Sequence, residues 1–458
     1  MTKMEKEVTS QAAVLESVRK SGAGKVKVGF ADIDGVIRGK YLHVDKFLSA
    51  VEGGFGFCDV VFGWDMNDQT YDNARLTGWH LGFPDAQARL DLDTYRRVPW
   101  ENDVPFFLGE FVKADGSPYP LCPRQLLRRV LARAEKMGFG VMCGVEYEFF
   151  NFRETPQGWA ERRGPPEPIT QGMFGYSLLR TAANREYFTA LMDDMAKFRI
   201  PLEGLHTETG PGVYEAAIMF SGALEAADRG VLFKLACKEI AARFGIMPTF
   251  MAKWHPKYPG SSGHVHQSLT DGKKNLFHDP KGRHKGMSKL FESYLAGQVA
   301  FLMEFAPMFW PTINSYKRLV DGFWAPVKPT WGIDNRTASF RVLPGSPKST
   351  RLETRCPGAD MNAFLAIAAV VAAGLEGVEK GLKLTTEPIH GDNVGGESVV
   401  RAPRTLIETT RIFHASKLAR EWFGSDFVDH YAATREWEWR KWLDAVTDWE
   451  LKRYFEII

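Results

Sequence analysis

Five carboxylates and one imidazole have the side-chain types and local spacing expected of a metal site. Each lies in a short stretch typical of a β-strand, and together they are Glu146, Glu148, Glu208, Glu215, His264 and Glu353. Gathered on one face of a sheet, they would form a cage with two sites for a hard divalent cation. Arginine-rich segments surround them, and arginine neutralises the charge that develops on a transferred phosphoryl group. The pattern therefore predicts metal-dependent phosphoryl transfer.

Such a cage needs strands that point these side chains the same way. In the stretch 141–150, apolar residues alternate with Glu146 and Glu148. Residues i and i+2 of a strand share a face and lie about 7 Å apart. The two carboxylates are therefore expected to project together, and their repulsion requires a counter-charge.

Three further segments are expected to bring the remaining groups together. The stretch 206–215 has Gly-Pro-Gly at its centre and predicts a hairpin that brings Glu208 close to Glu215. Alternation around 264–268 places His264, His266 and Ser268 on one face, and alternation at 351–355 does the same for Arg351, Glu353 and Arg355.

Carboxylate-rich sites favour magnesium or manganese, and a single imidazole is compatible with either ion. The alternative for any one Glu-x-Glu or His-x-His pair is a solvated, charged strand face, which is common in proteins. A Walker-type phosphate loop is absent, and the run GGFG at 53–56 lacks the spacing of a dinucleotide-binding fingerprint. Phosphate binding is therefore assigned to arginines and metal ions.

Length, composition and cysteine content indicate the general class of protein. The chain has 458 residues, of which 44% are hydrophobic and 25% charged, and this predicts a soluble globular protein of at least two domains. The net charge of +2 gives no indication of nucleic-acid binding. Five scattered cysteines without a Cys-x-x-Cys pair argue against disulfides and zinc and favour a cytoplasmic location. The charged residues 1–7 lack the apolar run of a signal peptide.

Turn residues and periodicity suggest how the chain is divided. Strands are expected at 25–30 and from 36 onward, joined by a turn at Asp34-Gly35, and the cluster at 114–118 marks a boundary. Helices are predicted from Pro123 onward, over 221–244 and over 287–305. The apolar run 363–375 is too short to span a membrane, which takes about 20 residues, and is interpreted as a buried helix.

From about Val26 onward, the sequence resembles the glutamine synthetase superfamily. Four segments carry this resemblance: GVEYEFF at 144–150, GSSGHVHQSL at 260–269, NSYKRLV at 314–320, and NRTASFR at 335–341 together with RLETR at 351–355. The resemblance implies an α+β fold, with an N-terminal β-grasp domain over 1–120 and a C-terminal catalytic α/β domain over 121–458. The catalytic domain would contain a curved antiparallel sheet.

The resemblance also implies roles for particular residues. Glu148, Glu208 and Glu215 look like ligands of a first metal ion, and Glu146, His264 and Glu353 like ligands of a second, both Mg²⁺ or Mn²⁺. The residues that resemble ATP contacts are His266, Ser268, Arg341 and Arg351. Those that resemble glutamate contacts are Gly260, Arg318 and Arg355. Arg336 looks like the arginine that stabilises the transferred phosphoryl group.

The implied reaction has two steps. ATP phosphorylates the γ-carboxylate of L-glutamate, and an amine then attacks the acyl phosphate. Members of the superfamily form two stacked hexameric rings with active sites between subunits. The resemblance therefore implies a dodecamer.

The chain departs from glutamine-forming relatives around the acceptor. Their Asp-Gly-Ser-Ser loop is replaced by the stretch 56–65, in which Asp59 and Asp65 are the candidate substitutes and Asp65 a candidate base. Their Gly-Tyr-Glu-Ala-Pro becomes GFWAP at 322–326, so that Trp324 stands in place of a glutamate that contacts ammonium. Pro259 replaces an asparagine that contacts glutamate, and no tyrosine-bearing adenylylation loop is recognisable at 385–399.

An indole in place of a carboxylate suits an amine with a hydrocarbon tail, because its apolar surface packs against alkyl groups and its face attracts an ammonium ion. Trp64, with Phe62 and Trp331, is predicted to extend this wall, and Asp59 to lie near the amine. The sequence therefore predicts a glutamate–amine ligase that prefers a short monoamine such as isopropylamine. The alternatives are a putrescine or polyamine ligase, a glutamine synthetase, a catalytically silent relative, and an ATP-grasp ligase.

Overall fold

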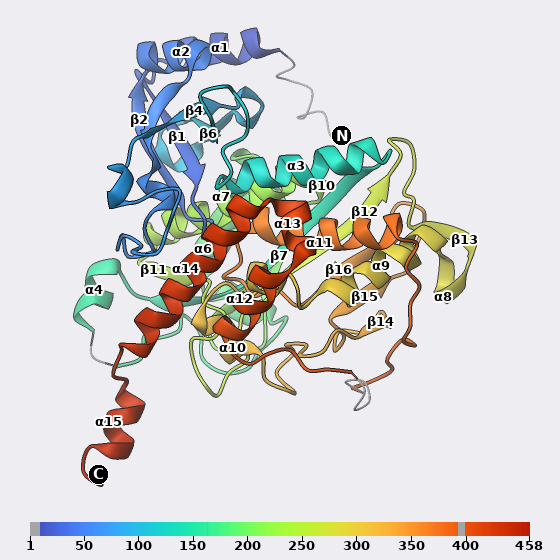
Figure 1. The fold of residues 1–458 in the computed structure, drawn as a ribbon. Helices are drawn as coiled ribbons and strands as arrows, with labels where there is room; N and C mark the ends of the chain where they lie inside the picture. Colours follow the sequence, from blue (N-terminus) through green and yellow to red (C-terminus); the bar gives the residue numbers. More distant parts are fainter. Residues whose placement is uncertain (1–9, 163, 393–398) are drawn as a thin grey trace.

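The computed structural model describes residues 10–162, 164–392 and 399–458. The charged start at 1–7 and part of the stretch 385–399 lie outside the described residues. Two β-sheets form the framework, a smaller one near the N-terminus and a larger one that carries the acidic motifs (Figure 1). Helices pack around both sheets.

The smaller sheet begins with the hairpin expected from the Asp34-Gly35 turn. Strand β1 (Lys25–Ala31) pairs antiparallel with β2 (Ile37–His43), with Ala31 opposite Ile37. The Asp32 carboxylate accepts hydrogen bonds from the backbone N–H groups of Asp34 and Val36, at 3.0 and 2.9 Å. Gly35 has a φ of 81°, a backbone conformation that glycine adopts without strain.

The chain then crosses this sheet in the order β2-β1-β6-β4-β3, with β5 paired to β6. β1 and β6 run parallel, and the other pairs are antiparallel. The further strands are β3 (Phe55–Cys58), β4 (Asp85–Leu90), β5 (Arg96–Val98) and β6 (Val104–Val112). The helices of this part are α1 (Gln11–Lys20) and α2 (Val44–Gly53).

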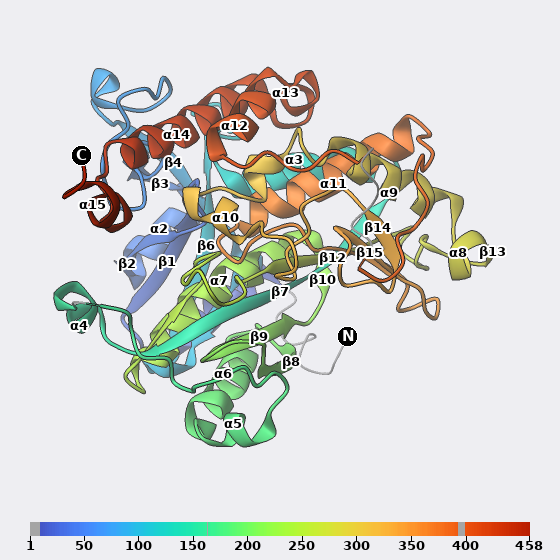
Figure 2. The same cartoon turned by 90° about the horizontal axis from the view of Figure 1, so that it is seen from below.

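Strand β7 (Gly140–Arg153) lies between β12 and β9 in the larger sheet (Figure 2). The order of this sheet is β14-β15-β16-β12-β7-β9-β8. β10 and β11 also pair with β7. The other strands of this sheet are β8 (Leu202–Thr207), β9 (Val213–Ile218), β10 (Ser221–Gly222), β11 (Ile246–Thr249), β12 (Gly263–Thr270), β14 (Trp331–Ile333), β15 (Phe340–Leu343) and β16 (Arg351–Thr354). Strand β13 (His278–Gly282) lies outside both sheets.

Alternation along β7 separates core from site, as predicted. Val145, Tyr147 and Phe149 are buried against helices, whereas Glu146 and Glu148 are only half-buried and point to the other face. The helices that pack together behind the sheet are α3 (Pro123–Lys136), α7 (Ala223–Ala242), α9 (Lys289–Phe301) and α11 (Ala363–Glu379). The first 15 residues of α11 are buried, which confirms the predicted core helix.

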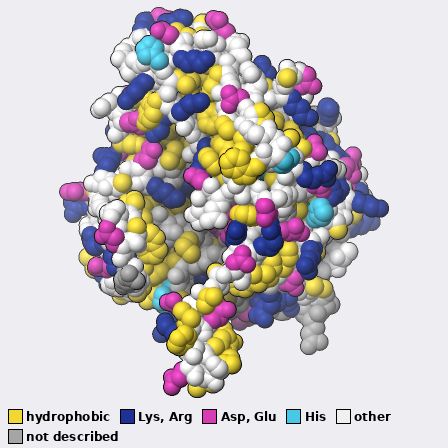
Figure 3. Space-filling model, turned by 60° about the vertical axis from the view of Figure 1, so that its left-hand side comes forward, with side chains coloured by type: hydrophobic (Ala, Val, Ile, Leu, Met, Phe, Trp, Pro, Cys, Tyr) yellow, Lys and Arg dark blue, Asp and Glu magenta, His cyan; other side chains and the backbone are white. Residues whose placement is uncertain are grey.

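The remaining helices border the larger sheet or follow it along the chain. They are α4 (Pro156–Glu161), α5 (Leu178–Ala182), α6 (Arg185–Lys197), α8 (Arg283–Gly286), α10 (Ile313–Arg318), α12 (Leu406–Ala415), α13 (Lys417–Phe423), α14 (Ser425–Leu443) and α15 (Asp448–Tyr454). Helix α15 projects from the body, and apolar side chains gather on the projecting segment (Figures 1 and 3). Trp449 and Leu451 of this helix are exposed. Among the described residues, no helix is both long and apolar enough to cross a membrane.

Candidate active site

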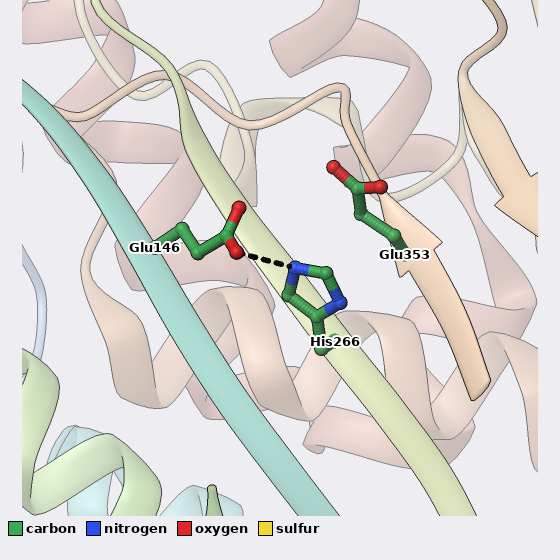
Figure 4. A group of neighbouring side chains, drawn as sticks. All are labelled: Glu146, His266 and Glu353. Atoms are coloured by element: carbon green, nitrogen blue, oxygen red, sulfur yellow. Dashed lines mark ion pairs between the residues drawn. The ribbon is translucent and has the colours of Figure 1, made fainter. Parts of the chain in front are cut away.

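Strand register brings Glu146, His264, His266 and Glu353 together. His264 lies opposite Glu146 in the β12–β7 ladder, and His266 lies opposite Glu353 in the β12–β16 ladder. His266 Nε2 is 3.1 Å from Glu146 Oε1 (Figure 4). His264 Nδ1 lies 3.3 Å from Glu146 Oε2 and 3.4 Å from Glu353 Oε1. His264, predicted as a metal ligand, therefore faces the two carboxylates, and so does His266, which was predicted as an ATP contact.

Cations surround the fully buried Glu353. Arg341 Nη1 donates to Glu353 Oε2 at 2.8 Å, and Arg355 Nη1 donates to Glu353 Oε1. Burial alone would raise the pKa of Glu353, but Arg355 and the two histidines lower it to about 2. Glu146 is likewise held well below its usual pKa by the histidines, despite burial. Both carboxylates are thus ionised at neutral pH.

The hairpin between β8 and β9 forms a second acidic group. Glu215 pairs with His206 across the ladder, and Glu208 follows directly after β8, so that ligand atoms of His206, Glu208 and Glu215 lie within 4.8 Å of one another. Glu148 lies opposite Glu215 in the β7–β9 ladder. This arrangement confirms the predicted proximity of Glu208 and Glu215. It also adds His206, which alternation with Glu208 in the sequence could have indicated.

In this second group the nearby Arg355 lowers the pKa of Glu215, but it does not offset the opposing contributions. Burial and the nearby Glu148, Glu146 and Glu208 raise the pKa of Glu215 to about 9. A bound divalent cation would remove this repulsion.

The donor sets of both groups fit Mg²⁺ or Mn²⁺, since they consist of carboxylate oxygens with imidazole nitrogens. His266 Nε2, which faces Glu146, and His206 Nε2 are buried and have no hydrogen-bond partner. Buried polar atoms rarely lack a partner, so these two nitrogens are consistent with a ligand at each group.

A cavity of about 440 Å³ opens over the acidic cage. Its predicted lining residues, besides the carboxylates and His264, are Gly260, Trp324, Arg336, Arg341 and Arg355. Tyr176, Thr209 and Ser262 also line it and were not predicted. The Ser262 N–H donates to Glu148 Oε2 at 2.6 Å, which explains how this carboxylate is held.

A second cavity of about 240 Å³ lies on the other side of Glu146, which lines both. Of the four predicted ATP contacts, His266, Ser268 and Arg351 line this cavity, and Arg341 lines the larger one. Arg351 Nε donates to His266 Nδ1 at 3.2 Å. Glu203, Phe220 and Lys348 were not predicted, although Lys348 lies only three residues before Arg351.

Arg318, predicted to contact glutamate, lies behind the cavity wall. It is fully buried and donates to Ser262 Oγ at 2.8 Å and to the Cys356 carbonyl at 2.9 Å. A Cβ on Gly260 would lie 2.7 Å from the Arg318 side chain, so the missing side chain of Gly260 makes room for it. Within this chain, Arg318 supports the wall and does not line the cavity.

The structure does not bring Asp59, Trp64 and Asp65 to either cavity of the same chain. All three lie beside the smaller sheet. Asp65 Oδ1 accepts from the N–H groups of Asn67 and Gln69, and Asp65 Oδ2 accepts from the Trp437 indole at 2.9 Å. Burial and the nearby Asp85 raise the pKa of Asp59, while the Thr77 hydroxyl opposes this change.

Two residues predicted to extend the apolar wall belong to the core, which corrects that prediction. Phe62 is 0% exposed and packs edge-on against Phe111. Trp331 is 1% exposed, and its indole donates to the Thr386 carbonyl at 3.0 Å. Sequence gave no means of telling a buried aromatic ring from one that faces a cavity.

Trp324 behaves differently from these rings. Its side chain is 56% exposed and lines the larger cavity together with Glu148 and Glu215. Its φ of 60° is left-handed, which is uncommon for a bulky residue. The indole is thus held over the acidic cage and is not packed into the core.

A curved sheet that presents acidic groups beside two cavities is the architecture expected of the superfamily. Residues 120–454 match the family model for the glutamine synthetase catalytic domain. The chain belongs to the glutamine synthetase family and has the fold of its ligases.

Three curated relatives refine this placement. The chain is 49% identical to a type-1 glutamine synthetase 2 of Dictyostelium discoideum, over 98% of this chain and 87% of the relative. It is 36% identical to a glutamate–isopropylamine ligase of a Pseudomonas species, over 97% and 98% of the two chains. It is 37% identical to a γ-glutamylethanolamide synthetase of Streptomyces coelicolor, over 94% and 92%.

Among solved structures, one described as apo GmaS without ligand superposes with a TM-score of 0.83. It is 26% identical and covers 96% of this chain and 99% of its own. The α+β fold inferred from the motifs is thereby confirmed.

Proposed function

We propose that this protein joins the γ-carboxylate of L-glutamate to a small primary amine, with ATP as phosphoryl donor. The product is a γ-glutamyl amide, released with ADP and phosphate. The preferred acceptor is a short alkylamine such as isopropylamine. Two relatives that are 36% and 37% identical to this chain are named for ligation of an amine, which supports this class of reaction.

In the first step, a γ-carboxylate oxygen attacks the γ-phosphorus of ATP and ADP leaves. Arg336 and Arg355 line the larger cavity, where they would stabilise the negative charge on the phosphoryl group. Two Mg²⁺ or Mn²⁺ ions held by the acidic groups would neutralise further charge. His266, Ser268 and Arg351 line the smaller cavity and are assigned to the nucleotide.

In the second step, the amine nitrogen attacks the acyl carbon, phosphate leaves, and the nitrogen loses a proton. The observation that carries the proposal is the exposed indole of Trp324 in the same cavity as Glu148 and Glu215. An indole offers no carboxylate to ammonium, but it packs against an alkyl group and attracts a protonated amine by about 0.5–2 kcal/mol.

Glutamine synthesis is the second candidate. The relative that shares 49% identity is named a glutamine synthetase, and ammonium would need no apolar wall. Putrescine is a third acceptor, but its far ammonium group would favour an additional carboxylate. Asp59, Asp65 and Asp68 do not line the larger cavity of the same chain.

The experiment is an acceptor panel. Glutamate-dependent phosphate release from ATP is measured with ammonium, isopropylamine, ethylamine, ethanolamine, putrescine and aniline at equal concentrations of the free base. We expect the short monoamines to give the highest kcat/KM. Stimulation by ammonium alone would rule out the amine-ligase function, and a preference for putrescine would rule out the apolar-tail argument.

The proposal includes a homo-oligomer of two stacked hexameric rings in the cytoplasm, with a β-grasp domain over 1–120 and a catalytic domain over 121–458. An active site between subunits would bring Asp59, Trp64 and Asp65 of one subunit to the cage of its neighbour. The apolar exposed surface of α15 is consistent with contacts between copies. The five cysteines are all unpaired, as is usual in a reducing compartment.

A further inference from the structure

Two loops border the larger cavity next to each other. The 252–261 loop is closed by a hydrogen bond from the Ser261 N–H to the Ala252 carbonyl at 2.9 Å, and its residues Pro259 and Gly260 line the cavity. The Trp324 turn, residues 319–325, supplies the indole. The first loop borders the glutamate side of the proposed site, and the second borders the amine side.

Lys253 joins the two loops. Its side chain is 7% exposed and does not line the cavity. The ammonium group donates to the Tyr258 carbonyl within its own loop, and it lies 4.4 Å from the ring centroid of Phe323, the residue before Trp324. One cation therefore contacts both the 252–261 loop and the Trp324 turn.

The backbone of Lys253 is held by two hydrogen bonds to the Asn314 side chain. The Lys253 N–H donates to the Asn314 side-chain oxygen at 2.8 Å, and Asn314 Nδ2 donates to the Lys253 carbonyl at 2.7 Å. Asn314 belongs to α10, whose N-terminus is capped by Thr312 and Ser315. The position from which the Lys253 side chain reaches Phe323 is thus fixed by a helix.

The Trp324 turn needs such support. Gly322 and Trp324 have φ values of 79° and 60°, and a left-handed tryptophan persists only where its neighbours hold it. Arg401 holds the first part of the turn through Asp321 and through the Leu319 carbonyl at 3.1 Å. Lys253 holds the part next to the indole.

We propose that Lys253 is a positioning residue that couples the 252–261 loop to the Trp324 turn and so sets the apolar wall of the amine pocket against the glutamate site. The inference rests on the proposed function, since it assigns Trp324 to the acceptor. Lys253 acts through Phe323 and touches no reacting atom.

The test compares Lys253→Met, Lys253→Arg, Phe323→Leu and the double variant Lys253→Met/Phe323→Leu, with Lys257→Met as control on the same loop. The KM values for isopropylamine, glutamate and ATP are measured together with kcat. Lys253→Met should raise the KM for the amine about three- to tenfold, the range expected for loss of a partly desolvated cation–π contact. The KM for ATP should change less than twofold.

Two features separate positioning from a general loss of structure. Lys253→Arg keeps a cation that can reach both the carbonyl and the ring, so it should retain the amine KM. Phe323→Leu should raise the amine KM as Lys253→Met does, and the double variant should be no worse than either single variant, because both remove one link. Lys257 is exposed, and its replacement should change nothing.

Equal changes in all three KM values, or effects that multiply in the double variant, would overturn the inference. If Lys253→Met does not fold, Lys253→Arg and Phe323→Leu still test the link. Failure of the proposed function is distinguishable, because it appears in the wild-type acceptor panel. In that case the same variants are measured with ammonium, and a selective, non-multiplying rise in its KM would support the link, whereas an unchanged KM would overturn it.

Discussion

The acidic cage and the acceptor side of the larger cavity are built in different ways. The cage lies on paired strands, where the ladder of β7, β12 and β16 fixes Glu146, His264 and Glu353 relative to one another. The acceptor side depends on a turn, where Trp324 is exposed and has a left-handed backbone. Strand register resists change, since a shift of one residue would move every side chain to the other face. A turn tolerates substitution.

This difference explains how one family can keep its chemistry and vary its acceptor. Under the proposed function, activation of glutamate would require the whole cage, whereas the choice of amine would depend on a few side chains in a turn. Relatives named for glutamine, isopropylamine and ethanolamine are compatible with such a division. The predictions below test whether the two regions are as separate as the structure indicates.

The largest effect is expected in the cage. Glu353→Gln removes the charge that binds Arg341 and Arg355, and it should lower kcat about a hundredfold or more with every acceptor. Glutamate-dependent phosphate release measures this loss. Glu421→Gln, which removes an exposed carboxylate paired with Arg133, is the control and should remain active. A loss of activity with only one of the amines would contradict the separation between the acidic cage and the acceptor side.

The second prediction concerns Glu215. Its pKa of about 9 means that it holds a proton at neutral pH in the absence of a cation. An ion bound by Glu215 would displace this proton, so its affinity should rise with pH up to about 9, and about one proton should be released when this second group binds its ion at pH 7.5. Calorimetry in buffers with different ionisation enthalpies measures the release.

Glu215→Gln should abolish this proton release, while Glu203→Gln, in the smaller cavity, should leave it unchanged. Proton release that persists in Glu215→Gln would place the titrating group elsewhere in the cage.

The third prediction addresses the acceptor side. Trp324→Glu should shift the ratio of kcat/KM for isopropylamine and ammonium about tenfold toward ammonium, because a carboxylate replaces an apolar wall. The KM for ATP should be unaffected. Trp159→Glu, a similarly exposed tryptophan outside both cavities, serves as the matched control. An unchanged ratio would remove Trp324 from the amine pocket.

The smallest effect concerns the support of residues 59–65. His430 of α14 contacts the Phe62 carbonyl at 2.9 Å, and burial lowers its pKa to about 4. In the unfolded chain a histidine takes up a proton near pH 6.5. The contribution of neutral His430 to the free energy of unfolding is therefore fully present above pH 6.5. It decreases as the pH falls toward 4, by about 1 kcal/mol between pH 7.5 and 5.5.

Denaturant unfolding at several pH values measures this slope. His430→Gln can still donate to the carbonyl but cannot become charged, so the slope should be shallower than in the wild type. The exposed His43→Gln should leave the slope unchanged. Equal slopes in the wild type and His430→Gln would show that His430 is not the buried titrating group.

The acidic cage could be predicted from the sequence because the spacing of residues within single strands and turns determines which side chains share a face. Alternation along β7 placed Glu146 and Glu148 on one face, and the Gly-Pro-Gly turn brought Glu208 near Glu215. His206 was missed although it alternates with Glu208 in the sequence. Tyr176 was missed because its place depends on contacts between segments, including its stacking on His206 with ring centroids 4.4 Å apart. Phe62 and Trp331 were misplaced because composition does not distinguish a packed ring from a pocket ring.

Glu146 separates the two cavities and lines both. A substitution there would disturb both pockets at once, whereas changes at Trp324 or at Phe220 would each affect a single pocket. The molecule is in this sense modular for evolution and for engineering. Libraries that vary the Trp324 turn can explore new acceptors while the smaller cavity stays intact, provided that the carboxylate between them is left untouched.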